Sequence, residues 1–144
     1  MRRYQLLPIA LSAVILFALG AAAQDKASGP VKASPAFAEV LLKKTELLAE
    51  VEALAPDHTD ESPKIVDLRY EIAGLDRYLA KMLSLAPTDT SRLTTALGKL
   101  IVKRMSLDAE LNRLSRTLNS AHPDHKRAQK RVAVFDAAIK EILP

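Results

Sequence analysis

The sequence predicts an all-α protein made of two repeated antiparallel helical hairpins, packed as a four-helix bundle or as separate coiled-coil hairpins. Aromatic residues make up only 4% of the 144 residues and there are four glycines, so the apolar content is the Leu, Ala, Val and Ile of packed helices. Apolar residues recur at spacings of three and four over long stretches. The chain also matches itself at an offset of sixty residues.

The first 23 residues have the organisation of a secretory signal peptide. Arg2 and Arg3 precede an apolar run over residues 6–19, and three alanines precede Gln24. The apolar run is shorter than the roughly 20 residues that span a bilayer. We therefore expect cleavage after Ala23, with a retained membrane anchor as the alternative. The expected location is periplasmic or secreted, with no membrane span after cleavage.

Residues 24–34 are small, polar and contain Pro and Gly, which predicts a disordered lead-in to a helical domain over 35–144. Three helix starts are marked by a capping residue followed by Pro at the first helical position, where a missing N–H costs nothing: Ser34-Pro35, Ser62-Pro63 and His122-Pro123. Stops are marked by Pro56, Pro87 and Asn119. The expected helices span about 35–55, 63–85, 90–119 and 123–143.

A heptad-like apolar seam supports the pairing of these helices. In the helix 63–85 it comprises Ile65, Leu68, Ile72, Leu75, Leu79 and Met82, and the helix 90–119 has a comparable row of leucines. Lys44 and Arg104 interrupt the seam, and either set its register or extend their charge to solvent. Because the connecting loops are short, consecutive helices must run antiparallel, which gives hairpins over 35–85 and 90–143.

The internal repeat aligns residues 41–83 with 101–143 without a gap. The identical pairs are Lys43/Lys103, Leu47/Leu107, Ala49/Ala109, Glu50/Glu110, Leu54/Leu114, Pro63/Pro123, Ala73/Ala133 and Asp76/Asp136. Shared composition between two Leu- and Ala-rich helices could produce as many identities. The matched prolines and the absent gap favour a true repeat.

Two surfaces are candidates for binding a partner protein or a second copy of the chain. Leu41 and Leu42, with their repeat mates Ile101 and Val102, give their helices a second apolar face beside the seam. That face is buried between the hairpins in a closed monomer, or binds a partner in an open arrangement. We expect the closed bundle, because about 120 residues form too small a core to leave much apolar surface unused.

The second candidate surface is a basic patch in the last helix, formed by Lys126, Arg127, Lys130 and Arg131. Such a patch binds phosphates, anionic lipid or an acidic partner, but it is more often a solvated helix face. Residues 24–87 carry a net charge of −3 and residues 88–144 a net charge of +5, so this helix face is also expected to lie toward the acidic hairpin.

The three histidines of the chain fall at the two predicted hairpin turns. His58 lies in the first turn and His122 and His125 lie at the second, each beside acidic residues. In an up-and-down bundle both turns lie at one end, so imidazoles and carboxylates could gather a divalent metal there. The simpler interpretation is that capping and turn positions favour such polar residues.

Composition excludes several classes of function. The chain has no Cys, hence no disulfide framework, thiolate zinc site, Cys nucleophile or lipid-modified cysteine. Without the leader its charge is only +2, which gives no reason to expect nucleic acid. No catalytic or phosphate-binding motif is present, so we expect no enzyme, no cofactor and no small-molecule substrate. The sequence predicts an exported non-enzymatic protein that binds macromolecules through helix faces, with a periplasmic metal-binding protein as the alternative.

Overall fold

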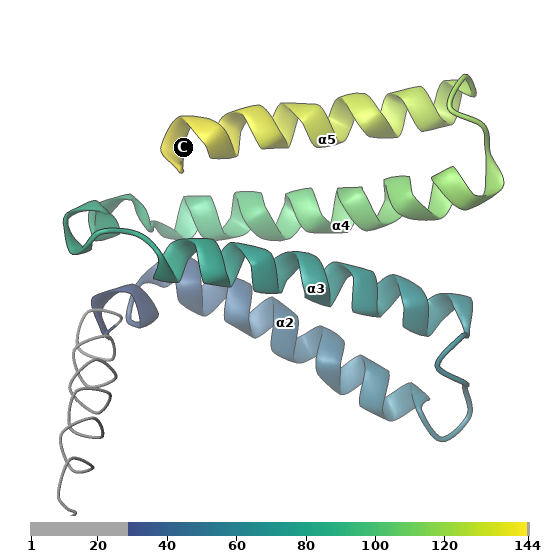
Figure 1. The fold of residues 1–144 in the computed structure, drawn as a ribbon, viewed down its shortest axis with the longest axis horizontal. Helices are drawn as coiled ribbons and strands as arrows, with labels where there is room; N and C mark the ends of the chain where they lie inside the picture. The colour runs from purple at the N-terminus through teal and green to yellow at the C-terminus, as the bar shows by residue number, and fades with distance from the viewer. Residues whose placement is uncertain (1–28, 144) are drawn as a thin grey trace, which may run out of the picture.

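The structure is a computed structural model that describes residues 29–143, and over this range it is all-helical with no strand. Its helices are α2 (Pro35–Leu54), α3 (Pro63–Leu83), the 3-10 helix η1 (Pro87–Arg92), α4 (Thr95–Thr117) and α5 (Pro123–Ile142) (Figure 1). The all-α prediction is confirmed. The expected signal peptide and the residues up to 28 lie outside the described part of the chain.

Side-chain caps mark the beginnings of α2, α4 and α5, whereas α3 begins at Pro63 without a side-chain cap. The Ser34 hydroxyl accepts a hydrogen bond from the Phe37 N–H, and the His122 ring nitrogen accepts one from the Asp124 N–H. Helix α4 begins at Thr95, five residues later than expected, because residues 87–92 form η1 and Thr94 provides the cap. The other three helices begin where the proline signals predict.

The end of the expected lead-in is folded, contrary to the prediction of disorder over 24–34. Residues 29–32 are helical, and the side chain of Val31 is buried in the core. The Ser34 hydroxyl donates a hydrogen bond of 2.6 Å to the Val31 carbonyl. The composition is polar, but a single apolar side chain anchors this segment.

Helix α4 is the centre of the molecule. It packs against α2, α3 and α5, whereas α5 packs mainly on α4 and lies at the opposite edge of the molecule from α2 (Figure 1). The approach of α4 to α2 is close at Gly98, where an added Cβ would lie 2.7 Å from the Glu39 Cβ and 3.0 Å from the Ala36 Cα. The first hairpin therefore packs mainly on α4 of the second pair, and the bundle is not closed around all four helices.

The core is concentrated at the end of the molecule near η1. There Leu75 of α3 and Leu97, Ile101 and Met105 of α4 are fully buried, and Leu143 after α5 is 1% exposed. At the other end, α2 and α5 separate toward the two hairpin turns (Figure 1). Of the helices within residues 29–143, none combines the length and the apolarity that a bilayer crossing requires.

Candidate functional site

Helix α2 presents an apolar face to solvent. Leu41, Leu42 and Leu48 are 43%, 58% and 42% exposed. With three exposed small residues they lie on one side of the helix, because their spacings are three, four and seven. We call this surface the α2 outer face: Ala38, Leu41, Leu42, Thr45, Leu48 and Ala49. A continuous apolar surface of this kind is typical of an association site.

The repeat mates of Leu41 and Leu42 have a different environment. Ile101 is fully buried and Val102 is part-buried against the core. Of the two environments expected for these four residues, Ile101 has the buried one and no partner can reach it in this fold. Partner binding stays a prediction for the accessible residues. The expectation of a closed bundle is wrong for α2, because α4 has helices on both sides and α2 lies at an edge.

The predicted basic patch lies on the exposed side of α5, where all four of its residues are accessible. Arg127 pairs with Asp124 at 3.2 Å, and Arg131 pairs with Glu110 of α4 at 3.4 Å. Because α5 packs mainly on α4, the patch does not face the acidic first hairpin as expected. Its surface continues into small apolar residues that include Val134, which is 67% exposed. We call it the α5 outer face: Lys126, Arg127, Lys130, Arg131, Ala133, Val134 and Ala137.

Arg104 joins α3, α4 and α5 through a largely buried polar network. Its guanidinium lies 3.0 Å from Asp108 and 3.0 Å from Asp136, and its side chain is only 17% exposed. The Tyr70 hydroxyl of α3 donates a hydrogen bond of 3.0 Å to the same Asp108 carboxylate. Burial alone would lower the pKa of Arg104, but the charges of Asp108, Tyr78 and Asp136 raise it overall.

Burial and the bond to Asp108 also raise the pKa of Tyr70 above its usual value. Burial likewise raises the pKa of Tyr78. Both rings are part-buried in the structure. The network therefore holds α5 and α3 to the central helix and keeps Arg104 charged.

A matching ion pair lies in the first hairpin. Lys44 of α2 donates to Asp76 of α3 at 2.5 Å, and both side chains are more exposed than in the Arg104 pair. Lys44 and Arg104 are repeat mates, and so are Asp76 and Asp136. The sequence predicted that both cations interrupt the seam, but it did not predict that Asp76 and Asp136 are their partners. The signal was present, since both partners match at the same offset of sixty.

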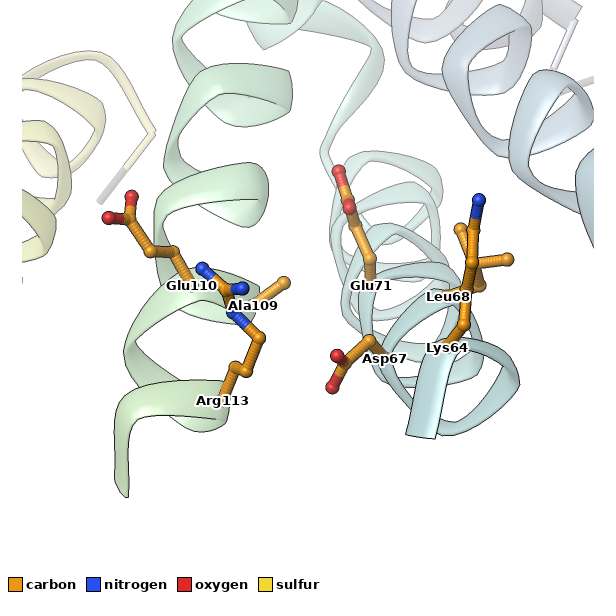
Figure 2. Close-up of a pocket in the computed structure, with 7 residues that line it drawn as sticks. All are labelled: Lys64, Asp67, Leu68, Glu71, Ala109, Glu110 and Arg113. Atoms are coloured by element: carbon orange, nitrogen blue, oxygen red, sulfur yellow. The ribbon is translucent and has the colours of Figure 1, made fainter. Parts of the chain in front are cut away.

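A groove of about 400 Å³ opens between α3 and α4, and Figure 2 shows charged side chains of both signs along it. Its lining residues are Lys64, Asp67, Leu68, Glu71, Ala109, Glu110 and Arg113. The Glu71 carboxylate is buried and accepts a hydrogen bond of 2.8 Å from the Ser106 hydroxyl. Asp67 pairs with Arg116, and Lys64 pairs with Glu50 at 2.8 Å. The carboxylates on α3 are thus satisfied by neighbouring side chains, as in a structural ion-pair seam.

The structure does not bring the three histidines together. The two turns lie at the same end of the molecule but at opposite edges (Figure 1). His58 lies 2.9 Å from the Asp57 carbonyl, and His122 caps α5. His125 contacts the Ser115 hydroxyl at 2.9 Å, and its other ring nitrogen is buried without a hydrogen-bond partner. Within residues 29–143 no three His, Cys, Asp or Glu side chains form a group that could hold a metal ion.

Comparison of the chain with protein-family models, with curated proteins and with solved structures finds no match in any of the three.

Proposed function

We propose that this is an exported, non-enzymatic helical protein that acts by binding a macromolecule through the outer faces of its edge helices. The observation that carries the proposal is the α2 outer face, on which three leucines are each more than 40% exposed. Exposed leucines scattered singly are common on proteins, whereas a stripe of them along one helix is typical of an interface.

The proposal includes an architecture of two repeated hairpins, one formed by α2 and α3 and the other by α4 and α5. The helices of each pair contact one another, and the equivalent ion pairs Lys44–Asp76 and Arg104–Asp136 join them at the same sequence separation. In repeat proteins each unit buries one face on its neighbour, so each terminal unit has one face that no other unit covers. The α2 outer face is such a face in the first unit.

Export rests on the leader-like residues 1–23. The test is mass spectrometry of the mature protein, which should begin at or near Gln24. A mature chain that still begins at Met1 would contradict the proposed export with cleavage.

Binding is tested by replacing Leu42 with a photo-crosslinking amino acid in the cells that make the protein. Illumination should join position 42 to a macromolecule, either a different one or a second copy. The same amino acid at Val66 is the matched control, because Val66 is an exposed apolar residue of α3, 38% exposed, outside both outer faces. The absence of any adduct at position 42 would overturn the binding role.

The metal-binding alternative depends on the turn histidines. No observation in the structure favours it over the apolar face, since each histidine has its own local neighbour and the two turns are separated.

A further inference from the structure

The α2 outer face has a sequence equivalent that is already packed inside the molecule. With the offset of sixty, Ala38, Leu41, Leu42 and Thr45 correspond to Gly98, Ile101, Val102 and Met105 of α4. In the structure these four α4 residues are buried or part-buried where α4 packs on α2 and α3. Helix α2 therefore exposes the same kind of face that α4 buries.

The same offset of sixty residues relates the α5 outer face to the side of α3 that packs against α4. Gly74 lies against Met105, because a Cβ added at this glycine would overlap the Met105 side chain. One turn away, Glu71 accepts the hydrogen bond from Ser106. The residues equivalent to Gly74 and Glu71 on α5 are Val134 and Arg131, and both are exposed.

We infer that the α5 outer face of one molecule binds the α2 outer face of a second copy, in the register with which α3 holds α4 within the chain. In this register Val134 faces Thr45 of the second copy, and Arg131 faces its Glu46. The inference rests on the binding role proposed above and names the partner.

Charge complementarity supports this partner independently of the repeat. The N-terminal half of α5 carries four cations, and the C-terminal half of α2 carries Glu46 and Glu52 on exposed positions. Helices paired antiparallel in the inferred register bring these halves together. Such a contact joins the half of the molecule with charge +5 to the half with charge −3 in the next copy.

The apolar parts of the two faces also match in the same register. Leu41 and Leu42 of α2 then lie beside Ala133, Val134 and Ala137 of α5, which are small enough to receive them. Inside the chain a glycine faces a methionine at the centre of the contact. Between copies a valine faces a threonine, so a small and a large side chain are exchanged for two of intermediate size.

The contact joins two different surfaces, which lie at opposite edges of the molecule (Figure 1). A heterologous contact of this kind does not close after two copies, and it generates open chains unless the rotation closes a ring. The assembly would thus continue between molecules the stacking of helices that occurs within one.

Sedimentation velocity of the exported protein over a concentration series tests the inference. The wild type should form larger species progressively as its concentration rises. Leu42→Glu and Val134→Glu should each raise the dissociation constant by about tenfold or more, because each places a hydrated carboxylate in the apolar part of the interface. Val66→Glu is the matched control and should sediment as the wild type does. Circular dichroism checks that all three variants stay helical.

Mixing the two blocked variants distinguishes the inferred contact from other dimers. Each variant keeps one intact face, so an equimolar mixture should form a one-to-one dimer and stop there. If Val134→Glu still self-associates while Leu42→Glu does not, the interface is a symmetric α2 pair and the inference is wrong. A wild type that stays monomeric at every concentration also overturns it.

The crosslinking experiment at position 42 separates this inference from the proposed function. Adducts with a second copy support both. Adducts with a different macromolecule and none with the chain itself support the binding role and overturn self-association. No adduct at all overturns both.

Discussion

Helices α2 and α4 carry corresponding residues and have opposite environments. Leu41 is 43% exposed on α2, whereas its repeat mate Ile101 is fully buried on α4. The residues differ little in size or polarity, so composition does not set their burial. The cause is position, because α4 has helices on both sides and α2 has α3 and α4 on one side only. Similar sequence faces are thus buried or exposed according to where their helix lies in the stack.

The largest expected effect follows from this contrast. Ile101→Glu should lower the free energy of unfolding by about 4 kcal/mol or more, because it buries a charge without a partner. Leu41→Glu should cost less than about 1 kcal/mol, because the side chain reaches water. Denaturant unfolding followed by circular dichroism measures both. Equal losses would show that the two faces have the same environment.

The two matching ion pairs should differ by a smaller amount. Arg104→Ala leaves Asp108 and Asp136 without their cation in a largely buried network, and should cost about 3 kcal/mol. Lys44→Ala removes an exposed pair with Asp76 and should cost about 1 kcal/mol or less. Thermal unfolding of the two variants gives the comparison. The expected order is contradicted if Lys44→Ala is less stable than Arg104→Ala.

Substitutions at two glycines test the packing around α4, with smaller expected changes in the free energy of unfolding. Gly98→Ala places a methyl group against the backbone of Ala36 on α2, and should cost about 2 kcal/mol as the helices separate. Gly74→Ala meets only the flexible end of Met105, and the gain in helix propensity of about 1 kcal/mol offsets the rearrangement. Chemical denaturation should show that Gly98→Ala is clearly less stable than Gly74→Ala. The reverse order would mean that the tighter contact of α4 is with α3 and not with α2.

Tyr70→Phe should cost about 1 kcal/mol at pH 7, the value of its hydrogen bond to Asp108. Because folding raises the pKa of Tyr70, its contribution is complete below the unfolded value near 10 and is lost as the pH rises through the folded value. Stability measured from pH 8 to pH 11 should therefore fall less steeply in the variant. An identical slope in the two proteins would count against the Tyr70 contribution.

The smallest expected effect concerns the two turns. Saturating zinc should leave the melting temperature unchanged, because the two turns that carry the histidines lie apart (Figure 1) and no metal-ligand group forms within residues 29–143. A rise that disappears in the His58→Ala/His122→Ala double variant would revive the metal-binding alternative.

Local signals predicted the helices well. Ser34-Pro35, Ser62-Pro63 and His122-Pro123 mark starts that hold in the structure, because the fixed backbone of a proline at the first helical position is a local property. Ser34 and His122 also cap their helices, whereas the Ser62 side chain does not. The start of α4 was wrong because residues 87–92 form η1 and Thr94 supplies the cap. Val31 was missed because one apolar residue in a polar segment gives no periodic signal.

The candidate site was harder to predict because it depends on how the hairpins meet. The apolar pattern predicted a second face at Leu41, Leu42, Ile101 and Val102, but nothing local distinguishes the exposed leucines from the buried Ile101. Two glycines lie at the close contacts of α4, Gly98 in its contact with α2 and Gly74 in its contact with α3, but their role is evident only from the structure. Whether the two hairpins are a true repeat stays a prediction that the paired ion pairs support.

The uneven attachment of α5 along its length has a consequence for the rates at which its two ends open. Its C-terminal end is fixed in the core by Ile139 and Leu143, and the Leu143 carbonyl accepts a hydrogen bond of 2.9 Å from Lys81. Its N-terminal end has only α4 beneath it, with Ala128 and Val132 as the buried residues. Amide protons of α5 should therefore exchange with solvent in a gradient, fastest near Pro123 and slowest near Ile139, while those of α4 exchange last.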